Sequence, residues 1–184
     1  MKNTITYLCL LLLISGAGQC QNVLLEAKLA VTLPSPAWPD FTREIQGGRL
    51  IYTSKPNPIF DKAGQNITPN ISFILEQIPD ALDLKTFSME LQRELSKDQP
   101  DGLHNLRVLK TYRAGGRDAV IRQKNMVGYQ LNYLDKDSVA HTVYVVYIVH
   151  NSVGVQAIFD STTEVFKQCG SEFLRTIHSI TTLP

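Results

Sequence analysis

The stretch from residue 139 to residue 180 limits what this chain can fold into more than any other part of the sequence. It opens with VAHTVYVVYIV, in which both alternating sets of side chains are mostly apolar. A strand that avoids water on both sides belongs in the middle of a sheet that is covered on both faces. The turn HNS follows, in which Asn151 tolerates positive φ, and residues 153–159 read as a second strand. The stretch therefore predicts a buried hairpin.

An amphipathic helix is predicted directly after this hairpin. Ser161, with Glu164 three residues later, forms a capping-box pattern in which the serine side chain begins the helix. The apolar residues that follow are spaced by three, four and four positions, which places them on one helix face: Phe166, Cys169, Phe173 and Ile177. We expect this face to pack on the sheet.

The upstream part of the chain adds strands and one more helix. Alternating or β-branched runs predict strands over residues 28–33, 48–54, 71–78, 106–112, 118–124 and 126–134. Asp83 is placed to cap a helix that residues 99–102 are expected to end, and its apolar stripe is Leu84, Phe87, Leu91 and Leu95. Because the connections between strands are short, hairpins are favoured. The predicted fold class is α+β, with a mostly antiparallel β-sheet flanked by helices.

The N-terminal residues predict a segment that is removed from the mature protein. Residues 1–4 carry a positive charge, residues 5–14 form an apolar run and residues 15–18 are small, which is the pattern of a secretory signal peptide. The apolar run is too short to span a bilayer. A buried N-terminal strand or helix is the alternative interpretation. We therefore divide the chain into a signal peptide (1–18), an N-terminal linker (19–26) and a single domain (27–184).

Two forms of export are compatible with this N-terminus. In the favoured one, the protein is periplasmic or secreted. In the other, it is a membrane-anchored lipoprotein with a lipid on Cys20, although Ala17 and Gln19 fit the lipidation motif poorly. We expect contact with a membrane only if Cys20 is lipidated. A disulfide between Cys20 and Cys169 is not favoured, because Cys169 lies on the apolar helix stripe, where buried free thiols are common.

The sequence contains no local motif for catalysis. Neither a G-x-S-x-G nucleophile pattern nor a glycine-rich phosphate loop before a helix is present. The histidines lack metal-ligand spacing and are interpreted as satisfied structural groups: His104, His141 in the central strand, His150 in the hairpin loop, and His178. We assign no catalytic residue, no metal ligand and no cofactor. The net charge of +1 gives no basis for nucleic-acid binding.

Three residues are the sequence-based candidates for ligand or partner binding. Trp38, the single tryptophan, either stacks on a ligand or plugs the core, and the core interpretation is favoured because large aromatic residues mostly serve burial. Phe60 and Asn66 lie in a long proline-containing loop, residues 55–70, which is either mobile or functional. Asn66 also begins a glycosylation pattern, which would be inert in a bacterial chain.

The order of these elements resembles the PsbP-like superfamily, in particular its bacterial DcrB-like and LpqN-like branches. The resemblance covers about residues 27–182 and includes Pro34, Trp38, Asp40, Gly116 and Ser179, but Ala37 replaces the usual glycine before the tryptophan. It implies a PsbP-like α/β sandwich and an exported or lipid-anchored protein without catalytic activity. Some members of the superfamily bind partner proteins or act as chaperones, and many are uncharacterised. No family site residue is specific enough to transfer.

These observations favour a non-enzymatic, exported protein of the cell envelope. We expect it to be a protein-binding or accessory module with a protein partner in the envelope. The alternative is an enzyme, such as a hydrolase, whose site is assembled from residues far apart in the sequence. An open sheet edge or an exposed apolar patch would favour the binding module, and a buried group of perturbed titratable residues in a pocket would favour the enzyme.

Overall fold

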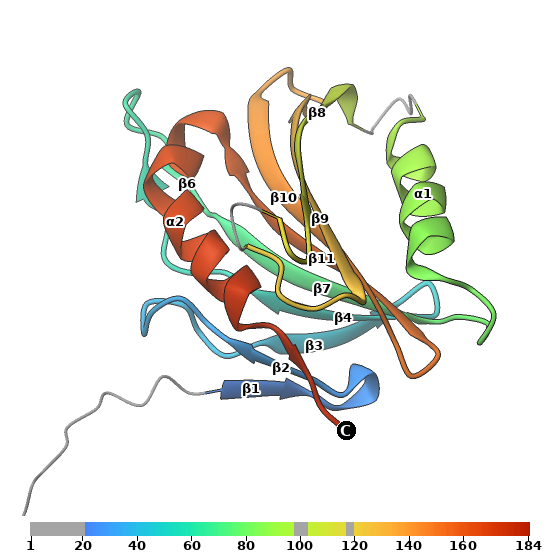
Figure 1. The fold of residues 1–184 in the computed structure, drawn as a ribbon. Coiled ribbons are helices and arrows are strands. Elements are labelled where there is room, and N and C mark those ends of the chain that lie inside the picture. The colour runs from blue at the N-terminus through green and yellow to red at the C-terminus, as the bar shows by residue number, and fades with distance from the viewer. Residues whose placement is uncertain (1–20, 98–102, 117–119) are drawn as a thin grey trace, which may run out of the picture.

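The computed structural model of this protein describes residues 21–97, 103–116 and 120–184. Its centre is a seven-stranded antiparallel sheet with the strand order β3-β4-β7-β11-β10-β9-β8. Helix α1 lies on one face of this sheet, and helix α2 with a small three-stranded sheet, β1-β2-β12, lies on the other (Figure 1). The predicted α+β class with a mostly antiparallel sheet is confirmed. The predicted signal peptide and Cys20 lie outside the described residues.

The elements have the following bounds. The large sheet contains β3 (Thr42–Gln46), β4 (Arg49–Ser54), β7 (Asn70–Gln77), β8 (His104–Arg113), β9 (Met126–Leu134), β10 (Ala140–His150) and β11 (Val153–Thr162). The small sheet contains β1 (Gln21–Leu24), β2 (Leu29–Thr32) and β12 (Thr181–Thr182). A separate two-stranded ribbon contains β5 (Ile59–Phe60) and β6 (Asn66–Ile67). The helices are the short 3-10 helix η1 (Leu25–Ala27), α1 (Leu84–Leu95) and α2 (Thr163–Ser179).

Strand β10 is an interior strand that is buried on both faces, as its composition predicts. It pairs with β11 on one side and with β9 on the other. The side chains of one face join the core beneath α2: Tyr144, Val146 and Ile148. The side chains of the other face join a second core beneath α1: Val143, Val145 and Tyr147. The sheet therefore separates two hydrophobic clusters, and β10 contributes to both.

The turn between β10 and β11 is tighter than expected. His150 pairs with Val153, so the loop contains only Asn151 and Ser152, which have φ values of 50° and 59°. Two successive residues with positive φ are what a two-residue hairpin with right-handed strand twist requires. His150 is thus the last residue of β10, and the prediction that it lies in the loop is wrong.

The start of α2 also differs from the prediction. β11 continues to Thr162, so Ser161 is a buried strand residue that pairs with Thr142. The N-cap is Thr162, whose side chain makes no capping hydrogen bond. The capping-box pattern fails because pairing with β10 holds Ser161 in the sheet one residue longer than a cap allows. The apolar stripe itself is confirmed, since all four of its residues are buried: Phe166, Cys169, Phe173 and Ile177.

Helix α1 is built as its sequence predicts. The Asp83 side chain accepts a hydrogen bond of 2.7 Å from the backbone N–H of Thr86, which satisfies one free donor at the helix start. Phe87 and Leu91 are buried against the sheet. Gly154 at the start of β11 allows this close packing, because a Cβ atom there would lie 2.5 Å from the ring of Phe87. The predicted helix end at residues 99–102 lies outside the described residues.

Two predictions about the N-terminal half need correction. Residues 21–24, expected to be linker, form β1 on β2, and Leu24 is buried in the main core. This short strand has no sequence signal of its own and is held by its partner. The loop 55–70 is not wholly irregular, since Ile59 pairs with Ile67 in the β5–β6 ribbon.

The strand predicted over residues 118–124 is also wrong in its described part. β8 pairs with β9 directly, and residues 120–125 run beside the sheet without strand pairing. Ile121 is buried in the main core, and Asn125 accepts a backbone hydrogen bond from Val149. Strand β9 is longer and alternates more regularly, so it offers β8 the better ladder, while burial of Ile121 holds the intervening segment in place.

Replacing Phe173 with alanine is expected to lower the free energy of unfolding by about 3–5 kcal/mol, because the ring is fully buried between α2 and the sheet. Urea denaturation followed by circular dichroism measures the change. Met89→Ala is the control, since Met89 on α1 is 59% exposed and should shift stability by less than about 0.5 kcal/mol. A neutral Phe173→Ala would show that α2 does not pack on the sheet.

Gly154→Ala is expected to destabilise the protein by about 1–3 kcal/mol, because the added Cβ overlaps a buried aromatic ring. The matched control is Gly128→Ala on β9, where the nearest atom, Cδ1 of Ile121, would lie 3.4 Å from the new Cβ. Amide hydrogen exchange should show faster opening of α1 in the first variant only. Equal effects in both variants would contradict the close contact between α1 and β11.

Candidate functional site

A groove lies on the α1 face of the sheet, between the first turns of α1 and the paired ends of β8 and β9. Its volume is about 570 Å3. Its lining comes from three segments: Leu84, Lys85 and Ser88 of α1; Arg113 and Ala114 at the end of β8; and Lys124, Met126, Val127 and Tyr129 at the start of β9. We call it the basic groove.

Local geometry explains why these residues meet. Leu84 and Ser88 are four positions apart, so they lie on one face of α1. Val127 and Tyr129 are two positions apart, so they share a face of β9. Arg113 is paired with Val127 across the ladder and therefore lies on the same face. Residues that are separated by up to 45 positions in the sequence (84 to 129) thus line one groove.

The basic groove combines an apolar floor with a cationic rim. Leu84, Val127 and Tyr129 supply apolar surface, and the cations come from Lys85, Arg113 and Lys124. No Asp or Glu belongs to the lining, and none of the three cations forms an ion pair with another described residue. Ser88 donates a hydrogen bond to the backbone oxygen of Lys85, so its hydroxyl is already satisfied. A ligand with apolar and anionic parts would match this surface.

Strand β8 continues this surface along the edge of the sheet. It pairs with β9 on one side, and within the described residues no strand pairs with its outer side. Val108 and Leu109 are 55% and 53% exposed although both are large and apolar. The ladder is irregular between Val108 and Lys110, where two steps along β8 oppose one step along β9. This β-bulge twists the edge but leaves it uncovered.

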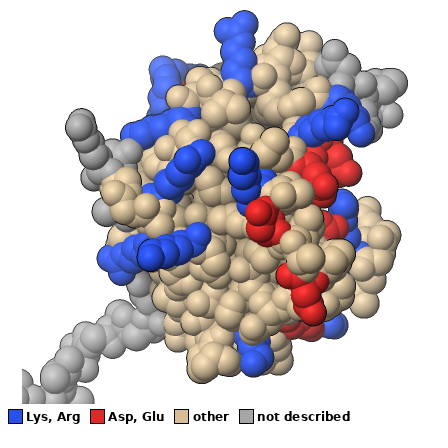
Figure 2. Space-filling view, turned by 45° about the vertical axis from the view of Figure 1, so that its right-hand side comes forward, with Lys and Arg blue, Asp and Glu red and all other residues tan. Residues whose placement is uncertain are grey.

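The charged side chains along this edge are all positive among the described residues. Residues 103–116 and 120–134 contain no Asp or Glu and five cations: Arg107, Lys110, Arg113, Arg122 and Lys124. Figure 2, which turns the α1 side of the molecule toward the viewer, shows Lys and Arg spread over much of this face, with the acidic residues gathered toward its right side. The net charge of +1 hides this separation, because cations and carboxylates occupy different parts of the surface.

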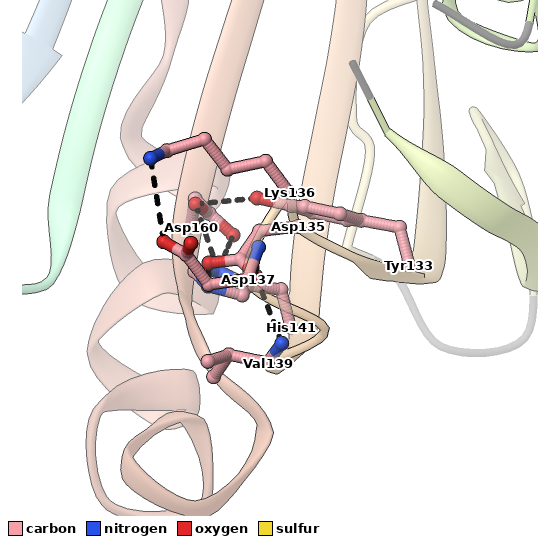
Figure 3. Close-up of polar contacts among 7 residues, drawn as sticks. All are labelled: Tyr133, Asp135, Lys136, Asp137, Val139, His141 and Asp160. Atoms are coloured by element: carbon pink, nitrogen blue, oxygen red, sulfur yellow. Dashed lines mark hydrogen bonds and ion pairs between the residues drawn. The ribbon is translucent and has the colours of Figure 1, made fainter. Parts of the chain in front are cut away.

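A second polar feature, the histidine cluster, lies at the opposite end of β9 and β10 (Figure 3). It consists of Tyr133, Asp135, His141 and Asp160. The strand register brings it together, since Tyr133 pairs with His141, and Asp160 lies on the next strand. The Nδ1 atom of His141 is 3.2 Å from both carboxylate oxygens of Asp160, and its Nε2 atom is 3.6 Å from Oδ2 of Asp135.

The remaining contacts tie the histidine cluster to the turn between β9 and β10. The Tyr133 hydroxyl donates to Asp160 over 2.9 Å, and its ring stacks on His141 with centroids 4.9 Å apart. Oδ1 of Asp135 accepts from the backbone N–H groups of Asp137 and Val139, which fixes the turn. Residues 136 and 137 thus form a tight turn that is held by the Asp135 side chain.

The titratable groups of the histidine cluster interact mainly with one another. Burial alone would lower the pKa of His141, but the hydrogen bond and charge of Asp160, together with Asp135, raise the pKa above its ordinary value. Burial and Asp160 also raise the pKa of the Tyr133 phenol, which keeps it a neutral donor. Both ring nitrogens of His141 lie beside carboxylates. The cluster thus binds three strand ends together and leaves neither nitrogen directed at a substrate.

The sequence-based candidates fall elsewhere in the structure. Trp38 is 5% exposed, packs edge-on against Phe173 and donates its indole N–H to Glu172 over 3.0 Å, so its ring faces the core. Phe60 and Asn66 are direct partners in the β5–β6 ribbon, and Phe60 is 66% exposed. The structure brings these last two together, but not with Trp38.

Two other residues that the sequence analysis considered, Cys169 and His150, serve the structure of the fold. Cys169 is a buried free thiol, and burial raises its pKa to about 12. Nε2 of His150 lies 3.0 Å from the backbone oxygen of Leu183 and helps to hold the C-terminal residues. Sequence reasoning missed both the basic groove and the histidine cluster. The excess of cations in residues 103–134, six against the single carboxylate Asp118, was the available signal for the groove, whereas the cluster has no local signal.

Comparisons with known proteins identify the fold. No family model and no curated protein matches the chain. The Ran-binding protein Mog1p of Saccharomyces cerevisiae superposes with a TM-score of 0.52 at 14% identity, covering 89% of this chain and 94% of that chain. Cyanobacterial PsbP (CyanoP) from Synechocystis gives 0.51 at 12% identity, covering 89% and 92%. The Pseudomonas aeruginosa protein PA94, of unknown function, gives 0.50 at 15% identity, covering 90% and 97%.

These identities are low, so the likeness concerns the fold alone. The chain has the PsbP-like fold that is shared with CyanoP and Mog1p, as the resemblance in sequence implied. Two further observations concern only the described residues. Neither of the two α-helices there is long and apolar enough to cross a bilayer. No group of three or more His, Cys, Asp and Glu side chains there is placed to hold a metal ion.

His141 should make stability depend on pH. Because its pKa is raised in the folded state, its stabilising contribution is fully present below the unfolded pKa of about 6.5 and is lost as pH rises through the folded value. We expect the free energy of unfolding to fall as the pH rises above about 6.5, and His141→Gln to flatten this fall. Urea denaturation at several pH values provides the measurement. His178→Gln is the control, and an unchanged pH profile in His141→Gln would contradict the role of the cluster.

Proposed function

We propose that this protein is a non-enzymatic binding module of the cell envelope, which docks an extended, acidic segment of another protein along β8. The observation that carries the proposal is the edge of the large sheet: β8 has no strand partner on its outer side within the described residues, and it carries exposed apolar and basic side chains. An extended segment that adds to such an edge gains backbone hydrogen bonds, and its side chains supply specificity.

The basic side chains along β8 favour a partner segment with negative charge. Exposed edge strands are usually protected against random association by charge, and lysine and arginine serve that purpose here. A second copy of this chain that paired antiparallel with β8 about Lys110 would bring Arg107 against Arg113 of that copy, so like charges would face each other. A segment with alternating carboxylates would instead neutralise these cations and cover Val108 and Leu109.

We also propose that the protein is exported, on the pattern of its first residues. The charged start, apolar run and small residues of positions 1–18 support export, with release to the periplasm or outside as the favoured form and lipidation of Cys20 as the alternative. Within the PsbP-like fold we place the chain nearest to the bacterial DcrB-like and LpqN-like exported proteins. The name of Mog1p, a Ran-binding protein, shows that a protein of this fold binds another protein, which supports the proposal by analogy only.

The alternative of a hydrolase gains no specific support. An enzyme would need titratable groups directed into a cavity. The histidine cluster contains the most strongly coupled groups, but they are engaged with each other: His141 lies between two carboxylates, and Tyr133 donates to Asp160. We therefore propose no catalytic residue, no cofactor and no metal.

The proposal is tested with a synthetic peptide of nine residues in which glutamate alternates with valine, labelled with a fluorophore. Fluorescence anisotropy should show that the mature protein binds this peptide, that a matched lysine–valine peptide does not bind, and that added salt weakens the complex. Arg107→Glu should reduce the affinity by about tenfold. Lys55→Glu changes the net charge equally at a distant exposed site and should have little effect.

Amide hydrogen exchange provides an independent readout of the same complex. Binding along the edge should slow exchange within residues 104–113 and leave β3, the other edge strand, unchanged. Equal binding of the acidic and the basic peptide, equal losses in Arg107→Glu and Lys55→Glu, or unchanged exchange in β8 would each contradict the proposal.

A further inference from the structure

We infer that the basic groove is the anchor pocket of this docking surface: it receives one aromatic side chain from the acidic segment, while carboxylates on either side of that residue contact Lys85, Arg113 and Lys124. The inference rests on the proposed function and adds the identity of the residue that the partner must supply. It is carried by the shape and chemistry of the groove, which differ from those of the exposed edge itself.

The groove lies at the end of the edge strand β8. Arg113 and Ala114, which end β8, also line the groove, so a segment that follows the edge reaches the groove without a change of direction. Thr111 and Arg113 pair with Tyr129 and Val127, two residues of its floor. A side chain that projects from the added segment toward the α1 face therefore points at the space between α1 and β9.

The volume and the lining of the groove suit one aromatic side chain. A volume of about 570 Å3 falls within the roughly 300–1,000 Å3 that is typical of ligand pockets, so one large ring fits with room for adjustment. The hydroxyl of Ser88 is already bonded to a backbone oxygen, so the floor does not require a polar group from the ligand. Aromatic anchors in pockets with polar rims carry much of the affinity of protein interfaces.

Three cations surround the groove. Lys85, Arg113 and Lys124 come from α1, from β8 and from the segment that precedes β9, so they surround the groove instead of lying on one side of it. Asp83, the carboxylate nearest to Lys85 in sequence, is engaged as the N-cap of α1. An aromatic residue with acidic neighbours would place its ring on the floor and its carboxylates on the rim. An aromatic residue with basic neighbours would meet three like charges.

Two other occupants are excluded by the same features or separated by experiment. A second copy of the chain would oppose its own basic edge, as described above. An anionic membrane surface would also attract the cations, and the exposed Val108 and Leu109 could then lie against lipid. A flat membrane, however, reaches the rim of a groove and not its floor, so a reporter on the floor distinguishes the two.

Val127 supplies that reporter in the unmodified sequence. Its side chain lines the groove and belongs to the core beneath α1, whereas Val139, 42% exposed at the other end of β9 and β10, serves as an internal control. The experiment records the methyl resonances of the mature protein labelled at valine. It adds the unlabelled glutamate–valine peptide with a central phenylalanine, or the same peptide with a central alanine. We expect a ring-current shift at Val127, little change at Val139, and about tenfold tighter binding of the phenylalanine peptide.

A variant that removes apolar surface from the groove provides the second test. Leu84→Ala should remove the advantage of the phenylalanine peptide, about tenfold, and leave binding of the alanine peptide unchanged. Leu25→Ala, at a position that is 74% exposed, is the matched control. If Leu84→Ala fails to fold, Lys124→Glu replaces it and should weaken both peptides, the phenylalanine peptide more strongly.

The outcomes separate this inference from the proposed function. If both peptides bind along β8 with equal affinity and Val127 does not shift, the anchor pocket is wrong and the docking edge stands. If neither peptide binds and exchange in β8 is unchanged, the docking edge itself is wrong. If vesicles containing phosphatidylglycerol shift the Val127 resonances as strongly as the phenylalanine peptide does, the groove is a lipid site and the inference is overturned.

Discussion

The pairing of β10 with β11 is the interaction on which the rest of the structure depends. Ten residue pairs join the two strands, from His141 and Thr162 to His150 and Val153. Because β10 is mostly apolar on both faces and β11 is buried along most of its length, neither sits at an edge, and the other strands and both helices are arranged to cover them. Helix α2 follows β11 without a loop and returns its apolar stripe to one face, while β7 and β9 complete the ladders on either side.

The two faces of this hairpin are covered unequally, and both candidate features result from that difference. The α2 face is closed by a helix of 17 residues together with the small sheet. The α1 face is closed by a helix of 12 residues, about 18 Å long at 1.5 Å per residue. Strand β10, with 11 residues, is about 36 Å long. A helix of half that length leaves both ends of the face only partly covered, with the basic groove at one end and the histidine cluster at the other.

The histidine cluster and the basic groove differ in how their side chains are arranged where α1 does not cover the sheet. At the β9–β10 turn, polar residues take the place of apolar ones and satisfy each other, so His141, Tyr133 and the two carboxylates need no further partner. At the groove, the apolar floor remains and its cations have no carboxylate partner among the described residues. A polar network whose groups satisfy one another stabilises the fold. Cations without carboxylate partners beside an open sheet edge can instead bind a negatively charged segment of another molecule. This contrast is why we place the binding function at the groove and not at the histidine.

The sequence by itself determined the elements whose signals are local. The apolar run after residue 139, the 3-4-4 stripes of both helices and the Asp83 cap each depend on neighbours within one or two turns, and the order of elements was sufficient for the PsbP-like fold. Only the tertiary structure decided what depends on register. It extended β11 through Ser161, replaced the strand predicted over 118–124 with pairing between β8 and β9, and turned residues 21–24 into a strand. It also brought Asp160 to His141, and Lys85 to Arg113, because side chains that meet across strands or between a helix and a sheet leave no periodic trace in the chain.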